Sequence, residues 1–315
     1  DQFPARDSWV DMAVSMEAVM GKKDINGVYL GRDGYLLEKS TAEETEKEQV
    51  EENINILSSF LNDMEKDYGK EHVSCLMVPS KDQAIPDRLP AFAQTEDRQW
   101  VVDTLKQKVT TPDLVLDLKQ TMEAHQNEYI YYRTDHHWST MGAALAYQVL
   151  ETALTGSAAL PDGPLKLESD SFYGTTWSSA GAGWVKPDSI YTWVDGDGFT
   201  VTAYHTGAAQ PGVLYDRSKL AVKDKYSMFL GGNQPLCVIS NPEASGGKLL
   251  VIRDSYADSL APFLAQDWQE VHLWDLRYNL NSLKQYIADN GIDQVLVLYS
   301  AANFASDANL FLLGL

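Results

Sequence analysis

The chain has 315 residues, of which 44% are apolar and 10% aromatic, enough for one large or two modest domains with a sizeable core. Its 45 acidic residues against 25 basic ones give a formal net charge of −20, which excludes binding driven by contacts to nucleic acid phosphates. No apolar stretch approaches the roughly 20 residues that a membrane span needs.

The first half of the chain predicts a hairpin followed by alternating helices and strands. Residues 26–38 form two β-rich runs around a Gly-Arg-Asp-Gly turn at 31–34, whose Asp-Gly pair suits positive φ angles. Residues 42–68 carry apolar side chains at helical spacing, with Thr41 as the expected N-cap. The next predicted elements are a strand over 72–79, a helix over 97–109, a strand over 113–118 and a helix over 139–156.

The composition then changes over residues 156–247, which are rich in Gly, Ser, Thr, Tyr and Trp and in turn signals. Short strands are predicted at 189–194, 198–205, 212–216 and 235–240. We interpret residues 156–247 as a β-rich insertion, because the α/β pattern of residues 1–155 resumes at 248–315.

The last part of the chain alternates strand and helix with short connections. The predicted elements are strands at 248–253, 270–276 and 293–300 and helices at 255–266 and 282–291. Such alternation implies parallel strands joined by crossover helices. We therefore expect an α/β core with a doubly wound, mostly parallel sheet.

The two cysteines, Cys75 and Cys237, each lie in a short apolar run that is typical of a strand. Two buried, reduced thiols are the simplest interpretation. A disulfide between them stays open, since spacing cannot decide it. No zinc-ligand spacing is present, and we expect neither a metal nor a cofactor.

Ser255 is the first candidate for chemistry. The apolar strand at 248–253 runs into Asp254 and Ser255, and a helix begins at once. Open α/β sheets bind ligands beyond the carboxyl ends of their strands, and a helix N-terminus there favours a developing oxyanion. The alternative is that Asp254 or Ser255 only caps the helix.

Asp135 and His137 are the second candidates, within the run Tyr-Tyr-Arg-Thr-Asp-His-His-Trp at 131–138. Their spacing lets the carboxylate hold the imidazole Nδ1–H and leave Nε2 as a general base for a serine, with Trp138 as a wall against water. Two alternatives remain: capping or surface roles for Asp135 and His136, and a metal bound by Asp135, His136 and His137. The other histidines are scattered singly, which disfavours the metal.

The Asp-His-His-Trp run resembles the motif for which the DHHW protein family is named. Further segments at 3–9, 27–37, 78–90, 225–233, 249–264, 273–278 and 295–300 also resemble blocks of that family. The family is similar to the alginate O-acetylation proteins, which have an SGNH-hydrolase-like fold related to the flavodoxin-like order of strands.

The resemblance implies a Ser-His-Asp triad, carried here by Ser255, His137 and Asp135. It also implies O-acyl transfer to a cell-surface or extracellular carbohydrate polymer, with a membrane-bound O-acyltransferase delivering the acyl group. An extracytoplasmic location is expected on the same ground, and a start without Met suggests that a targeting segment has been removed.

Further residues are candidates for binding the substrate or the oxyanion. Arg253 stands where the relatives commonly have Gly, and it would narrow the approach to Ser255 or add a cation near the oxyanion. Gly232 and Asn233 are candidate oxyanion donors, with a simple tight turn as the alternative. Arg277 and Tyr278 are candidates for binding a sugar or the acyl donor, with a structural ion pair as the alternative.

Three functions therefore compete. The first is acyl transfer by the triad, and the second is hydrolysis of carbohydrate or small esters by the same residues. The third is a non-catalytic surface-binding or scaffold protein that retains the fold. A separation of Ser255 and His137 beyond about 6 Å would favour the third, because activation needs a hydrogen bond.

Overall fold

The computed structural model describes residues 16, 20–39, 44–205 and 207–314. Its helices are α2 (Glu44–Tyr68), α3 (Lys81–Ala84), α4 (Gln99–Lys108), α5 (Lys119–Ala124), α6 (Thr140–Thr155), α7 (Thr175–Ala180), α8 (Ala257–Asp267), α9 (Leu283–Asn290) and α10 (Ala301–Ser306). No helix among the described residues has the length and apolar character to cross a membrane.

The strands form three sheets. They are β1 (Asp24–Ile25), β2 (Val28–Leu30), β3 (Leu36–Glu38), β4 (Val73–Val78), β5 (Val115–Asp117), β6 (Lys166–Phe172), β7 (Asp188–Thr192), β8 (Thr200–Ala203), β9 (Gln210–Pro211), β10 (Leu236–Ser240), β11 (Gly246–Arg253), β12 (Trp268–Trp274) and β13 (Gln294–Ser300). The central sheet has the order β5-β4-β13-β11-β12-β10-β8-β9, while β1-β2-β3 and β6-β7 form small sheets of their own.

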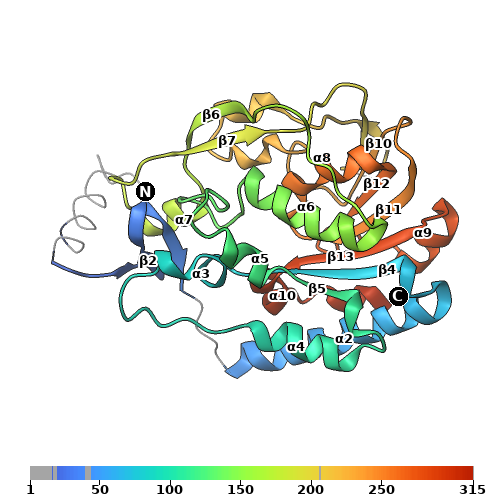
Figure 1. Ribbon diagram of the computed structural model, residues 1–315, viewed down its shortest axis with the longest axis horizontal. Coiled ribbons are helices and arrows are strands. Elements are labelled where there is room, and N and C mark those ends of the chain that lie inside the picture. The colour runs from blue at the N-terminus through green and yellow to red at the C-terminus, as the bar shows by residue number, and fades with distance from the viewer. Residues whose placement is uncertain (1–15, 17–19, 40–43, 206, 315) are drawn as a thin grey trace.

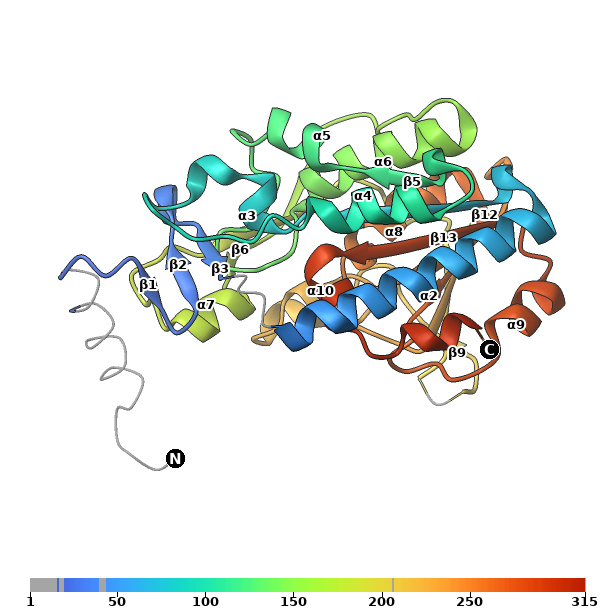
Figure 2. The ribbon, with the colours of Figure 1, turned by 90° about the horizontal axis from the view of Figure 1, so that it is seen from below.

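The pairing of β5, β4, β13, β11 and β12 is parallel, as predicted, whereas β10, β8 and β9 continue the sheet antiparallel. Alternate side chains of the buried strands enter two apolar cores. Leu249 and Val251 pack beneath α6 and α8, and Leu250 and Ile252 face α2, α4, α9 and α10 (Figure 1, Figure 2). Because β11 is covered on both faces, its residues 249–252 form a continuous apolar run.

Several local predictions are confirmed. Strands β2 and β3 form the expected hairpin, and Asp33 and Gly34 adopt φ angles of 56° and 78° in its turn. Ser139 caps α6, and Gly156 ends it at a φ of 89°. The expected start of the first long helix, with Thr41 as its cap, lies outside the described residues.

The segment 156–247 differs from the expected insertion in one respect. Its strands β8, β9 and β10 extend the central sheet, because β10 pairs with β12 of the core. Among the described residues of this segment, only β6 and β7 form a separate sheet, and the run at 212–216 contributes an isolated bridge at Tyr215 rather than a strand. The division into core and insertion stays a prediction, but the sheet does not divide at residue 247.

Both cysteines are buried free thiols. Cys75 packs in the core beneath α2, and Cys237 packs in the core beneath α6 and α8, so the sheet separates them. Burial raises the pKa of each thiol to about 12. We assign them a packing role.

Candidate active site

Ser255 lies directly beyond the carboxyl end of β11, in the turn that leads into α8. Asp254 fixes this turn: its Oδ1 accepts the Tyr256 N–H at 3.0 Å, and its Oδ2 accepts the Ser300 N–H and Asn303 Nδ2 at 2.8 Å each. The carboxylate thus ties the end of β11 to the end of β13. Of the two residues considered as caps, Asp254 accepts the backbone bond, which leaves the Ser255 hydroxyl available to His137.

The loop with Asp135 and His137 is closed by an antiparallel bridge between Tyr131 and Trp138. Inside the loop, buried Asp188 accepts the N–H groups of Arg133 and Thr134 at 2.9 and 2.7 Å. Asp188 belongs to β7, so a strand of the 156–247 segment holds the loop in place.

The three predicted side chains meet although 118 residues separate His137 from Ser255. His137 Nε2 lies 2.7 Å from Ser255 Oγ, and His137 Nδ1 lies 2.6 Å from Asp135 Oδ1. A carboxylate accepts only, so His137 Nδ1 carries the proton and Nε2 accepts from the serine hydroxyl. This geometry is that of a nucleophile, a base and an orienting acid.

Asp135 is 2% exposed and is held from two sides. Its Oδ1 also accepts the His137 N–H at 3.0 Å, and its Oδ2 accepts the N–H and Oγ1 of Thr175 at 2.8 and 3.1 Å. Burial alone would raise the pKa of Asp135, but the charges of His137 and His136 and these hydrogen bonds together lower it well below its usual range. Asp135 is therefore ionised wherever the protein is folded near neutral pH.

Lys81 connects the loop to the small sheet. Its buried Nζ donates to the carbonyl oxygens of Leu36, Arg133 and Asp135 at 2.7, 3.1 and 3.0 Å. Burial lowers the pKa of Lys81 to about 8, against the opposing influence of Asp188 and Asp135. All three ammonium protons are used on backbone oxygens, which makes Lys81 a structural clamp.

The wall around the imidazole differs from the expectation. Tyr226 stacks on His137 with ring centroids 3.9 Å apart and planes 10° apart, and His136 lies 3.9 Å away at a tilt of 35°. Trp138 is fully buried, and its Nε1 donates to the Tyr256 carbonyl and Ser259 Oγ at 3.1 and 2.9 Å. Trp138 therefore supports the turn after Ser255, while Tyr226 and His136 shield His137.

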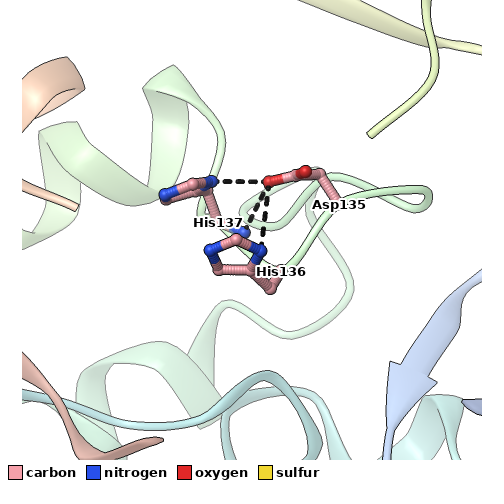
Figure 3. A group of neighbouring side chains, drawn as sticks. All are labelled: Asp135, His136 and His137. Atoms are coloured by element: carbon pink, nitrogen blue, oxygen red, sulfur yellow. Dashed lines mark hydrogen bonds and ion pairs between the residues drawn. The ribbon is translucent and has the colours of Figure 1, made fainter. Parts of the chain in front are cut away.

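Asp135, His136 and His137 also place one ligand atom each within 4.8 Å of one another (Figure 3). A metal held by Asp135 and His137 would replace their 2.6 Å hydrogen bond. His136 Nδ1 is already 2.8 Å from Thr175 Oγ1. The arrangement suits proton transfer better than coordination, and the expectation of no metal stays a prediction.

The candidate oxyanion donors fare differently. The Gly232 N–H donates to the Phe229 carbonyl at 3.1 Å and closes a turn, so it does not serve as the expected free donor. Asn233 is exposed, and its Oδ1 accepts from Arg253 Nη1 at 2.8 Å, which leaves its amide N–H groups to donate elsewhere. Among the described residues, no hydrogen bond engages the backbone N–H of Ser255.

Arg253 does not project into the approach to Ser255. Its side chain is fully buried, 3.0 Å from Asp258 and 3.8 Å from Asp275. Burial raises the pKa of Asp258 to about 6, although Arg253 and His137 act to lower it. Arg253 therefore does not narrow the approach to Ser255 as expected, and the cation expected near the oxyanion is instead paired with two buried acids.

Arg277 and Tyr278 follow the alternative interpretation. Arg277 makes a two-pronged ion pair with Asp275, at 2.9 Å from Nε and 2.6 Å from Nη2. Tyr278 is 53% exposed. The structure brings neither residue into contact with Ser255 or His137, so a role in binding substrate stays a prediction.

Residues that the sequence did not single out hold the site together: Lys81, Thr175, Asp188, Tyr226 and Asn303. They come from segments far apart in the chain, and none belongs to a motif with the triad residues. Lys81 and Tyr226 lie in the segments 78–90 and 225–233, which resemble blocks of the DHHW family, and that resemblance is the signal that the sequence holds for them. Thr175, Asp188 and Asn303 lie outside those segments.

Two family models match the chain. The model described as "DHHW protein" matches residues 107–274, and that described as "SGNH hydrolase-like domain, acetyltransferase AlgX" matches residues 28–179. A probable alginate O-acetylase AlgJ of Pseudomonas syringae pv. tomato is 26% identical over 171 residues, which cover 52% of this chain and 42% of that protein. The match thus spans less than half the length of this curated relative.

Solved structures share the fold. A DHHW family protein from Eubacterium siraeum superposes with a TM-score of 0.73 at 23% identity, covering 92% of this chain and 96% of its own. Bacillus cereus PatB1, solved with a sulfonyl adduct, gives 0.67 at 25% identity, with 90% and 96% covered. The DHHW family model matches more than half of the residues of this chain. The chain therefore belongs to the DHHW protein family and has an SGNH-hydrolase-like α/β fold.

Proposed function

We propose that this protein is a serine O-acyltransferase that transfers an acyl group, most simply acetyl, to a carbohydrate hydroxyl. The observation that carries the proposal is the continuous hydrogen-bonded line from Asp135 through His137 to Ser255, at 2.6 and 2.7 Å. The similarity to AlgJ and to the AlgX acetyltransferase model adds support for O-acetyl chemistry.

In the first half-reaction, His137 Nε2 takes the proton of the Ser255 hydroxyl as Oγ attacks the carbonyl carbon of an acyl ester or thioester. The resulting tetrahedral oxyanion accepts from the backbone N–H of Ser255, which has no hydrogen bond within the described chain. As the intermediate collapses, His137 gives its proton to the leaving group. An acyl-serine ester remains.

In the second half-reaction, a sugar hydroxyl takes the place of the leaving group. His137 Nε2 removes its proton, the sugar oxygen attacks the acyl carbon, and Ser255 Oγ leaves and is reprotonated. Asp135 holds the imidazole in one tautomer throughout, and Tyr226 and His136 limit the access of water to its faces. The donor is expected to come from a membrane-bound O-acyltransferase, and the location to be extracytoplasmic.

Hydrolysis is the second candidate, because Ser255 is partly exposed and water could enter as the acceptor. The 2.7 Å between Ser255 and His137 speaks against a purely non-catalytic scaffold, for which a separation beyond about 6 Å was the expectation.

The test is turnover of 4-nitrophenyl acetate with and without an added oligosaccharide. Ser255→Ala should abolish both nitrophenolate release and sugar acetylation, whereas Ser157→Ala, at an exposed serine in the loop after α6, should retain both. Acetylated sugar that appears only with Ser255 present supports transfer. Nitrophenolate release with no acetylated sugar supports the esterase. Acetylation that survives Ser255→Ala refutes the mechanism.

A further inference from the structure

A cavity of about 450 Å³ adjoins the triad at the carboxyl ends of β4 and β13. The triad side chains do not line it themselves, but His136 and Tyr256, the chain neighbours of His137 and Ser255, do, together with Ala302 and Asn303 of α10. Figure 2 shows α10 following β13, with α7 and the small sheet nearby. The volume falls in the range of small-molecule sites, about 300–1,000 Å³.

Four basic side chains line the cavity. Burial lowers the pKa of His136, which favours its neutral form. Each of the other three is matched by a protein group. The Lys81 ammonium group donates three hydrogen bonds, all to backbone carbonyl oxygens. Lys39 Nζ lies 2.6 Å from Asp24, and Arg98 Nε lies 3.3 Å from Glu96. The described lining therefore offers no uncommitted positive charge to a carboxylate of a ligand.

Hydrogen-bond acceptors are in better supply. Glu38 is exposed, and its Oε1 accepts from Thr176 at 3.0 Å. Asp82, which is 5% exposed, adds a second carboxylate to the lining. Hydroxyl groups of a sugar donate hydrogen bonds and carry no charge, so they match such a lining.

The charge of the whole chain acts in the same direction. A net charge of −20 repels a polyanion at long range, and a carboxylate that enters a cavity without a free cation loses hydration uncompensated. Alginate, named for the curated relative, is a polyuronate with a carboxylate on every sugar. The charges of this cavity therefore favour an uncharged sugar over such a chain.

We propose that this cavity binds a sugar residue of the acceptor and that the acceptor is an uncharged polysaccharide rather than a polyuronate. The inference rests on the proposed transferase function. It names the class of the second substrate and the surface that receives it, beside the acyl-serine.

The test compares acetyl transfer from 4-nitrophenyl acetate to cellopentaose and to pentamannuronate at low ionic strength, with acetylated products counted by mass spectrometry. We expect at least about tenfold more transfer to cellopentaose, with a smaller difference in high salt. Equal or greater transfer to pentamannuronate would overturn the inference, and so would no transfer to either sugar from an acylated Ser255.

Two substitutions at exposed Ala302 locate the effect. Ala302→Trp fills the cavity and should lower the ratio of transfer to hydrolysis with cellopentaose at least about tenfold. Ala302→Lys adds an uncommitted cation and should raise transfer to pentamannuronate. Ala153→Trp and Ala153→Lys, at an exposed alanine of α6, are matched controls that should leave both ratios unchanged. Unchanged ratios in both Ala302 variants would refute the placement of the acceptor.

Labelling by a sulfonyl fluoride separates this inference from the proposed function. Modification of Ser255 in the wild-type protein, found by peptide mass spectrometry, reports a reactive nucleophile without any acceptor. If Ser255 is labelled but acetyl transfer to cellopentaose does not exceed that to pentamannuronate, only the inference about the acceptor is refuted. Absence of labelling and of nitrophenolate release sinks the proposed function, and the inference with it.

Discussion

Gly174 is the position where a single methyl group should disable the triad. It precedes α7 with φ −88° and ψ −167°, a conformation that alanine adopts without strain. A Cβ at Gly174 would lie 2.2 Å from Asp135 Oδ2 and 2.3 Å from Asp135 Cβ. Ordinary carbon–oxygen contact begins near 3.4 Å, so the carboxylate must retreat by more than 1 Å.

That retreat breaks the geometry on which proton transfer depends. Asp135 Oδ1 would leave His137 Nδ1, now 2.6 Å away, and Oδ2 would leave the Thr175 N–H, now 2.8 Å away. A misplacement of about 1 Å costs about 10²-fold in rate, and full loss of the orienting acid costs about 10⁴-fold in the serine protease triad. We expect Gly174→Ala to lower kcat/KM for 4-nitrophenyl acetate by about 10²- to 10⁴-fold and stability by about 1–3 kcal/mol.

The assay pairs kinetics with urea unfolding and includes two comparisons. Gly196→Ala, whose new Cβ would meet Tyr215 at an ordinary 3.5 Å, should leave activity unchanged. In an Asp135→Asn background, Gly174→Ala should lower kcat/KM little further, because both changes act on the same hydrogen bond to His137. A folded Gly174→Ala variant within threefold of wild-type activity would refute the reasoning about Asp135.

Two further predictions concern the shield around His137 and a buried acid at the opposite end of the sheet. Tyr226→Phe keeps the ring stacked on His137 but loses the 3.0 Å hydrogen bond from the hydroxyl to the Ser255 carbonyl, so the free energy of unfolding should fall by about 1 kcal/mol with activity nearly intact. Tyr226→Ala removes the ring and should lower kcat/KM by about tenfold or more. Equal activity in the two variants would contradict a shielding role. Burial raises the pKa of Glu151 to about 7, so the folded state binds a proton that the unfolded state loses near pH 4.5, and stability falls as pH rises from about 4.5 to about 7. Glu151→Gln should remove this fall and raise the free energy of unfolding at pH 8 by on the order of 2 kcal/mol. Urea unfolding at pH 5 and pH 8 measures both effects. A pH dependence equal to that of the wild type would show that Glu151 is ionised in the folded protein.

The sequence predicts those features that depend on local pattern. The continuous apolar run at 249–252 marks a strand buried on both faces. Ser139 and Gly156 mark the ends of α6, because capping and positive φ are properties of single residues. The position of Ser255 follows from the same logic, since a strand that ends where a helix begins presents its side chain at the carboxyl edge of a parallel sheet. The spacing of Asp135 and His137 also suffices to predict their contact, which spans only two residues.

Long-range contacts set everything else. No local pattern could show that Tyr226 stacks on His137, that Thr175 holds Asp135, or that Asp188 secures the loop, because each pair joins segments 40 or more residues apart. In the folded chain the Gly232 N–H is engaged by a hydrogen bond within its own turn, so it is not the free donor that the sequence suggests. The Arg253 side chain is buried against Asp258 and Asp275 rather than placed at the approach to Ser255. Hydrogen-bond capacity and charge are properties of single residues, but the partner that satisfies each one is chosen by the tertiary structure, because a buried polar group must be paired wherever the packed chain places it.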